Sequence, residues 1–242
     1  MVASLTEQEA HIQRDAIEYA RRHKKAIAKR IAATELYPAE RDPVSVFMAG
    51  SPGAGKTEAS KALIEQLNTQ VLRIDPDELR SEFNTYNGGN AWLFQGAVSI
   101  LVEKIHDLAL NQKQSFILDG TLSNYEKSYA NIERSLSKNR FVQILYVYQE
   151  PIFAWKFVQA RELAEGRRIK KEDFIKQYFE ARIVVNRLKK EFGGRIQVDL
   201  LQKNLDNSKR LYKAGVDQID HHIQEKYTAA DISIQIDQIE SQ

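Results

Sequence analysis

The chain has 242 residues, of which 43% are hydrophobic and 28% are charged, and its formal net charge at pH 7 is +2. This balance is ordinary for a globular protein, and so small a charge does not by itself indicate a nucleic-acid partner. The absence of cysteine excludes disulfides, thiolate metal sites and cysteine nucleophiles. No apolar run reaches the roughly 18 residues of a membrane span, and the N-terminus lacks the apolar core of a signal peptide. We therefore expect a cytoplasmic protein with neither a membrane nor a nucleic-acid partner.

The first 42 residues predict one or two helices. Residues 6–9, Thr-Glu-Gln-Glu, have the S/T-x-x-E pattern of a capping box, and apolar residues then recur at helical spacing. A stretch with prolines at both ends, residues 38–43, predicts a linker into the next segment. We therefore expect an N-terminal helical extension, residues 1–42, followed by a second domain over residues 43–242.

A phosphate-binding loop is predicted directly after the first strand. The apolar run Val44–Ala49 has the length and β-branched content of a buried strand. The sequence Gly50-Ser-Pro-Gly-Ala-Gly-Lys-Thr57 and a helical pattern follow it, which is the context that a P-loop requires. In such loops the backbone amides cradle phosphate oxygens, the lysine reaches the β- and γ-phosphates, and the threonine hydroxyl ligates Mg²⁺. The predicted ATP-binding residues of the loop are Gly50, Ser51, Pro52, Gly53, Ala54, Gly55, Lys56 and Thr57.

Four more strands alternate with helices along the rest of the chain. The predicted strands are residues 71–75, 115–119, 142–147 and 195–201. The predicted helices are residues 77–83, 91–110, 125–137, 152–164 and 171–190, and towards the end a helix over 216–226 precedes a short alternating run at 232–236. Because this alternation is typical of βαβ units, we predict an α/β fold with a central, mainly parallel five-stranded sheet flanked by helices.

Acidic residues follow the second predicted strand, which we expect beside the first. Ligands of parallel sheets bind beyond the carboxyl ends of the strands, so Asp75 and Asp77 should face the P-loop crevice. A carboxylate there can accept the proton of a hydroxyl that attacks the γ-phosphorus. Asp75 suits the role of a helix cap, which makes Asp77 the candidate base. The alternative is that both residues are caps.

The third predicted strand ends in Asp119, and an apolar strand that ends in Asp is the Walker-B pattern. In this pattern the carboxylate holds Mg²⁺ directly or through water. Thr121 is placed to hydrogen-bond a substrate or a phosphate, and it could equally cap the next helix. The sequence therefore predicts Thr57 and Asp119 as metal ligands, with Asp77, Asp119 and Thr121 near the acceptor.

Arginines gather in residues 161–168, after the fourth strand and its helix. Guanidinium groups stabilise charge on a transferring phosphoryl group, and a lid that closes over the site excludes water. On this interpretation Arg168 contacts ATP, and the catalytic residues are Asp77, Lys56, Arg161 and Arg167. A solvated helix face, with Arg161 paired to Glu165 one turn later, explains the pattern equally well.

These motifs together resemble the zeta toxin family of P-loop kinases. The resemblance rests on residues 50–57, 74–77 and 118–121 and on Arg161 with Gly166-Arg167, whose order and spacing fit over about residues 44 to 170. It implies a P-loop kinase fold and transfer of the ATP γ-phosphate to the 3′-hydroxyl of the amino sugar in UDP-N-acetylglucosamine. It also implies Glu103 as a substrate contact, a position that otherwise indicates a solvated helix residue.

Three positions depart from the pattern of the family. Asp119 stands where the best-known members have Glu, Ser123 where some have a substrate-binding Arg, and Lys170 where Pro usually follows the second lid arginine. These differences concern the acceptor more than the donor. Two other functions therefore stay open: a kinase of another hydroxyl, on an antibiotic, a nucleoside or a polynucleotide end, and an NTP-dependent switch without an acceptor.

The resemblance also bears on partners. Zeta toxins are restrained by small helical antitoxins, which implies either an antitoxin protein as a partner or inhibition in cis by residues 1–42. The alternative for this segment is simple packing on the core.

Overall fold

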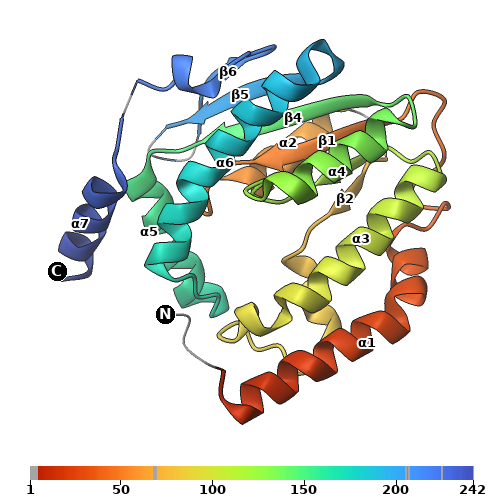
Figure 1. Ribbon diagram of the computed structural model, residues 1–242, viewed down its shortest axis with the longest axis horizontal. Helices are drawn as coiled ribbons and strands as arrows, with labels where there is room; N and C mark the ends of the chain where they lie inside the picture. Colours follow the sequence, from red (N-terminus) through yellow and green to blue (C-terminus); the bar gives the residue numbers. More distant parts are fainter. Residues whose placement is uncertain (1–4, 68–69, 205, 207, 225, 242) are drawn as a thin grey trace.

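In the computed structural model, six strands form one sheet in the order β2-β3-β1-β4-β5-β6 (Figure 1). The structure describes residues 5–67, 70–204, 206, 208–224 and 226–241. The strands are β1 (Val44–Ala49), β2 (Leu72–Ile74), β3 (Phe116–Leu118), β4 (Phe141–Tyr148), β5 (Gln197–Lys203) and β6 (Lys209–Lys213). All neighbouring strands are parallel except β5 and β6, which are antiparallel. The prediction of an α/β fold with a mainly parallel sheet is confirmed.

The described sheet has one strand more than the five predicted. The additional strand, β6, lies at the edge of the sheet, and all its residues are exposed. Its sequence, Lys-Arg-Leu-Tyr-Lys, buries no side chains and shows no apolar alternation, so the periodicity that reveals the other strands is absent.

The strand order corrects the expected neighbour of β1. β2 pairs with β3, and β3 pairs with β1, so the strand that precedes Asp75 is not adjacent to the P-loop strand. The strand adjacent to the P-loop strand is β3, which ends just before Asp119. Because β1, β2 and β3 are parallel, their carboxyl ends still open on the same edge of the sheet, as predicted.

Seven α-helices are found in the described part of the chain. They are α1 (Glu7–Ile31), α2 (Lys56–Leu67), α3 (Gln95–Asn111), α4 (Tyr125–Leu136), α5 (Pro151–Glu165), α6 (Lys171–Phe192) and α7 (Ala229–Glu240). Four short 3₁₀ helices accompany them: η1 (Glu78–Glu82), η2 (Ala91–Phe94), η3 (Gly193–Arg195) and η4 (Ile219–His221). Most predicted helices are therefore present, with shifted ends.

One prediction near the C-terminus is wrong. Within the described part of residues 216–226, the expected helix is reduced to η4, and residue 225 lies outside the described residues. The alternating run at 232–236 lies inside α7. A capping box formed by Thr228 and Asp231 starts α7. Ile232 and Ile236 are buried one turn apart, whereas Ile234 between them is 56% exposed. The burial therefore follows the period of a helix, not of a strand.

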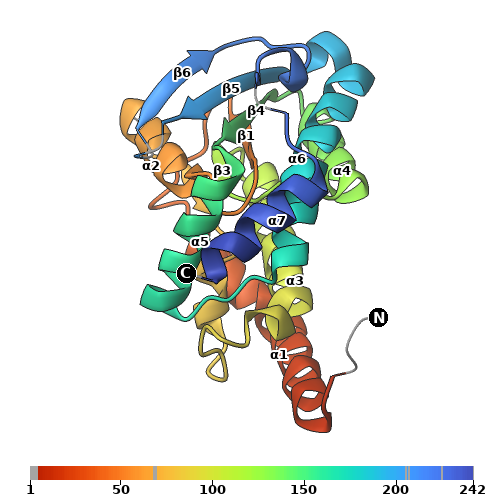
Figure 2. The same cartoon turned by 90° about the vertical axis from the view of Figure 1, so that its left-hand side faces the viewer.

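The two faces of the sheet carry different helices. Val46 and Met48 of β1 pack with Ala59 of α2, while Phe47 and Ala49 face the larger core that includes side chains from α1, α3, α4 and α6. This division follows from the alternation of side chains along a strand. Figure 2 shows α7 lying against α5 and α6 at the side of the molecule. No described helix is long and apolar enough to cross a membrane.

The N-terminal segment forms one long helix that lies along α3 (Figures 1 and 2). The predicted capping box is present, since the Thr6 hydroxyl accepts from Glu9 N and the Glu9 carboxylate accepts from Thr6 N. Ala16 and Ala20 are buried in the same core as the sheet. Ile17 packs closely on Gly96 of α3. The domain boundary at residue 42 stays a prediction.

Candidate active site

The P-loop joins β1 to α2, and its glycines are required by close backbone approaches. Gly50 has a φ of +132°, and a Cβ at this position would lie 2.2 Å from the Val147 carbonyl oxygen. Gly53 has a φ of +72°, and a Cβ there would lie 2.0 Å from the Ala154 carbonyl oxygen. Only glycine adopts such conformations at these contacts without strain. The loop is therefore seated against β4 on one side and α5 on the other.

Lys56 lies at the start of α2 and folds back over the loop. Its Nζ donates to the carbonyl oxygens of Gly50 at 3.0 Å and Ser51 at 2.6 Å. Burial lowers the pKa of Lys56 to about 8, and the charges of Asp119 and Asp77 oppose this shift. The ammonium group is therefore held at the mouth of the loop by weak neutral acceptors, and phosphate oxygens would be stronger partners for it.

Asp77 follows β2 and forms ion pairs with two arginines. Its Oδ1 pairs with Arg80 of η1, and its Oδ2 pairs with Arg167. Burial raises the pKa of Asp77, but the two guanidinium groups outweigh it and hold the pKa below its usual range. Asp77 is therefore a charged carboxylate.

Asp75 has a different environment from Asp77. Its Oδ1 accepts the Asp77 backbone N–H at 2.7 Å, which is the local capping role predicted for it. Burial and the charge of Asp77 raise the pKa of Asp75 to about 6, although Arg73 pairs with its other oxygen. The helix predicted to follow is the 3₁₀ helix η1. Asp75 therefore accepts a local backbone N–H and pairs with Arg73, whereas Asp77 pairs with two arginines from other segments.

Asp119 is bound by an arginine that the sequence motifs do not include. Its Oδ2 accepts from the Ser60 hydroxyl at 3.0 Å and from Arg73 at 3.0 Å (Nε) and 2.7 Å (Nη2). Arg73 of β2 also pairs with Asp75 and Glu78. The Arg73 guanidinium group of β2 thus links the end of β3, through Asp119, to η1, through Glu78.

The donor set suits Mg²⁺ more than a metal that needs a cage of protein ligands. No cluster of three or more His, Asp or Glu side chains that could hold a metal occurs in the described residues. Mg²⁺ is usually bound through one or two carboxylates together with substrate phosphates and water. Thr57 and Asp119, the predicted ligands, fit that requirement because they follow β1 and β3, which are adjacent.

Thr121 connects the third strand end to the P-loop. Its carbonyl oxygen accepts from Gly50 N at 3.2 Å, and its hydroxyl lies 2.9 Å from that of Ser123. The N-cap of α4 is Asn124, whose side chain accepts from Lys127 N. The alternative role of Thr121 as that cap is therefore excluded.

Glu103 is exposed on α3. It lies one turn after Ser99, which is bonded to Lys127 at 3.0 Å, and one turn before Asp107, which pairs with Arg134. Among the described residues it makes no hydrogen bond or ion pair with the other predicted site residues. The structure thus places Glu103 on the α3 surface that faces α4.

The predicted arginines lie around the end of α5. Gly166 ends this helix with φ +71°, and residues 166–170 connect it to α6. Arg161 lies 3.8 Å from Glu165, as the helix-face explanation predicts, and Arg168 lies 3.7 Å from Glu162.

Arg161 is also close enough to Lys56 for its charge to lower the pKa of that lysine. Arg167 alone of these three pairs with Asp77. Residues 166–170, which include Arg167 and Arg168, form the lid segment.

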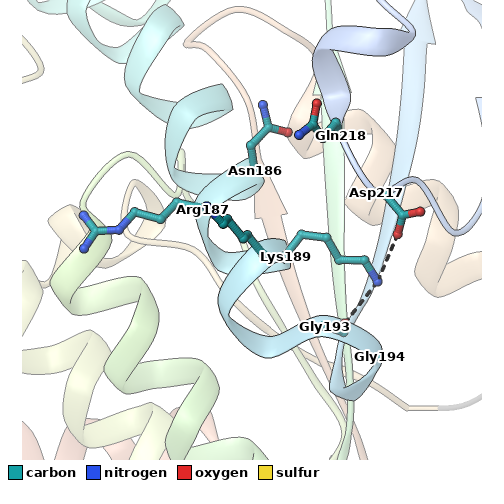
Figure 3. A pocket seen from close by; sticks show the side chains of 8 residues that line it. Asn186, Arg187, Lys189, Gly193, Gly194, Asp217 and Gln218 are labelled. Carbon is teal, nitrogen blue, oxygen red and sulfur yellow. Dashed lines mark hydrogen bonds and ion pairs between the residues drawn. The ribbon is translucent and has the colours of Figure 1, made fainter.

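A pocket of about 550 Å³ lies elsewhere, between the end of α6 and η4 (Figure 3). Lys189 Nζ donates to the carbonyl oxygen of Gly193 at 3.1 Å and lies 3.8 Å from Asp217. None of the predicted site residues lines this pocket. The candidate active site lies at the carboxyl ends of β1, β2 and β3, around the P-loop.

The parallel sheet, the P-loop at the end of β1 and the acids at the ends of β2 and β3 define a P-loop kinase fold. The family model described as Zeta toxin matches residues 28–217, and the chain belongs to the zeta toxin family.

Solved structures agree with this fold. A structure of the PezAT chromosomal toxin–antitoxin system of Streptococcus pneumoniae has a TM-score of 0.62 and 14% identity, covering 96% of this chain and 94% of that one. The AvrRxo1-ORF1:-ORF2 complex with ATP has a TM-score of 0.59 and 14% identity, covering 92% and 75%. At such identities the likeness shows the fold alone. A search of curated proteins found no match.

Proposed function

We propose that this chain is an ATP-dependent kinase that transfers the γ-phosphate to the 3′-hydroxyl of the amino sugar in UDP-N-acetylglucosamine. The observation that carries the proposal is the meeting of three groups from distant segments. Arg167 of the lid pairs with Asp77, whose charge in turn raises the pKa of Lys56 in the P-loop. A phosphate-binding lysine, a carboxylate and a lid arginine are the parts that phosphoryl transfer to a hydroxyl requires.

In this proposal ATP binds along residues 50–57, with Lys56 on the β- and γ-phosphates and Arg161, Arg167 and Arg168 over them. Thr57 and Asp119 would hold Mg²⁺, which offsets charge on the phosphates. The neighbouring AvrRxo1 structure that contains ATP supports ATP as the donor.

The acceptor would bind on the side of Asp77, with contacts to Thr121, Asp119 and Glu103. Asp77 takes the proton of the acceptor hydroxyl while the acceptor oxygen bonds to the γ-phosphorus. The bond from that phosphorus to the β–γ bridging oxygen breaks, and ADP leaves with the electron pair. The lid arginines stabilise the charge that spreads over the phosphoryl oxygens.

We also propose an antitoxin protein as the partner, in the cytoplasm, where ATP and nucleotide sugars are available. The support is that the PezAT neighbour comes from a toxin–antitoxin system. Inhibition in cis by residues 1–42 is the competing proposal, and the packing of α1 along α3 favours a role in the core over it.

The test is phosphoryl transfer from γ-labelled ATP with UDP-N-acetylglucosamine, beside a pool of cell metabolites and a reaction without acceptor. A Lys56→Met variant measured in parallel controls for a contaminating kinase. Label on the nucleotide sugar is expected. Label on another metabolite would overturn the acceptor, and slow hydrolysis alone would favour a nucleotide-dependent switch.

A further inference from the structure

Arg80 is a buried arginine that no motif accounts for. It is 9% exposed, and its Nη1 pairs with Asp77 Oδ1. Its Nη2 lies at the outer limit of a hydrogen bond, 3.5 Å from Gln95 Oε1, and its buried Nε–H has no partner among the described residues. A buried donor without a partner loses its hydrogen bond to water and destabilises the folded protein. Stability alone would favour an apolar side chain at this position, so the arginine calls for another explanation.

The two arginines on Asp77 are anchored differently. Arg80 belongs to η1, whose Leu79 and Phe83 flanks are buried in the main core. Arg167 belongs to the lid, which is outside the helices. The carboxylate of Asp77 therefore has one partner fixed to the core and a second partner on a connecting segment.

A guanidinium group on each oxygen of Asp77 lowers the basicity of the carboxylate and occupies one lone pair of each oxygen, which weakens it as a base for a hydroxyl proton. We propose that Arg80 is a positioning residue of Asp77: it fixes Oδ1 and leaves Oδ2 to take the acceptor proton once Arg167 has turned to the phosphates of ATP. This inference rests on the proposed function and deepens it, because it divides the two arginines between base and donor. Arg80 touches Asp77 and not the substrate.

The surroundings of Asp77 set the sign of the test. The charged groups that face it are Arg80 of η1, Arg167 of the lid, Lys56 of the P-loop and Asp75 at the end of β2. Against its burial, Arg167 and Arg80 hold the pKa of Asp77 below its usual range. Removing the charge of Arg80 should therefore raise this pKa.

The first measurement is the pKa of Asp77, obtained from the pH dependence of its carboxyl carbon NMR signal. It is made in four full-length proteins: the wild type, Arg80→Gln, Arg80→Lys and Arg30→Gln. Arg30 of α1 pairs with Glu82, the last residue of η1, so its substitution removes an arginine beside the same short helix without touching Asp77 and serves as the control. We expect a rise of about one unit or more in Arg80→Gln, the usual size for loss of an adjacent opposite charge. A smaller rise is expected in Arg80→Lys and none in Arg30→Gln.

The second measurement is the pH profile of phosphoryl transfer. In Arg80→Gln we expect kcat to fall about 10- to 100-fold, in the range of general-base effects, with the KM for ATP within about twofold of wild type. The acid limb should move to higher pH, and Arg80→Lys should restore it in part. A variant that merely packed worse would lose folded protein without moving the limb.

The outcomes separate the two proposals. An unchanged pKa of Asp77 in folded Arg80→Gln, or a higher KM with unchanged kcat, would overturn the role of Arg80 and leave the kinase proposal intact. If wild-type protein transferred phosphate to no acceptor, the proposed function would fail and the positioning role would fail with it. If Arg80→Gln does not fold, Arg80→Lys decides by the same two readouts.

Discussion

Arg167 and Asp77 lie ninety residues apart in the sequence and form an ion pair just beyond the end of β2. The contact joins the lid to the end of β2. It explains how a carboxylate at the edge of the sheet keeps its charge despite partial burial, since a guanidinium group lies on each of its oxygens. The same contact gives the lid a charged partner near the P-loop when no phosphate is bound.

The role of Asp77 is tested by Asp77→Asn. Asparagine keeps the volume and an acceptor for Arg80 but cannot take a proton at neutral pH. We expect ATP affinity within about threefold of wild type and phosphoryl transfer lower by roughly 100-fold or more, the usual size of a general-base effect. Asp237→Asn, which removes a surface partner of Lys171, is the matched control and should leave transfer unchanged. Near-normal turnover of Asp77→Asn would exclude it as the base.

The pKa of Lys56 predicts proton uptake when ATP binds. Burial lowers this pKa to about 8, so near pH 8 about half of the lysine is neutral in the free protein. Triphosphate favours the charged ammonium, so binding at pH 8 should take up a fraction of a proton, and at pH 6.5 almost none. Affinity should fall as the pH rises above 8.

Calorimetry in buffers with different ionisation enthalpies measures that uptake directly. The control is Lys56→Arg, because a guanidinium group stays charged at both pH values and should therefore take up no proton when ATP binds. Equal proton uptake at both pH values would contradict the lowered pKa of Lys56.

The seat of the P-loop on α5 is tested by Gly53→Ala. A Cβ there would lie 2.0 Å from the Ala154 carbonyl oxygen, and φ is +72°. Strain at such a position amounts to about 1–3 kcal/mol, so we expect a lower melting temperature and weaker ATP binding. Gly194→Ala is the control, because a Cβ at Gly194 meets nothing within 4 Å. Equal melting temperatures for the two variants would show that the loop gives way without strain.

The network below the crevice is tested by Arg73→Met. Methionine fills similar space but leaves Asp75 and Asp119 without their shared cation. Breaking a buried pair on one side costs about 3–5 kcal/mol, which thermal unfolding should report as a clear drop in melting temperature. Arg22→Met removes an exposed helix pair with Glu18 and should change stability by less than about 1 kcal/mol. A drop no larger than that of the control would contradict the structural role of Arg73.

Local pattern is sufficient for the parts of the fold that bury apolar side chains. Composition and spacing predict the strand at residues 44–49 and the glycine loop after it, and the structure confirms the alternation of strands and helices as far as β5. The neighbours of a parallel strand are set by long-range packing, which is why local pattern does not predict β3 between β1 and β2. It does not predict β6 either, because none of the side chains of that strand is buried.

The site residues that sequence reasoning misses, Arg73 and Arg80, share a physical reason. A single arginine has no sequence signature, because its role depends on which carboxylates the fold brings within reach. The spacing carries a partial signal: Arg73 lies two positions before Asp75 on the strand, and Arg80 three positions after Asp77. Such spacings put side chains on one face, but surface pairs have them as well.

The close fit of α1 on α3 bears on how the N-terminal segment can be studied. The match to the zeta toxin family begins at residue 28, so a protein shortened to that match would lose most of α1 and uncover the apolar side of α3 that Ala16, Ile17 and Ala20 close. Such a shortened protein would be prone to aggregate, and its lost activity would mimic a regulatory effect. Substitutions on the outer face of α1, at positions such as Arg22 and Lys25, change that surface while keeping the core closed.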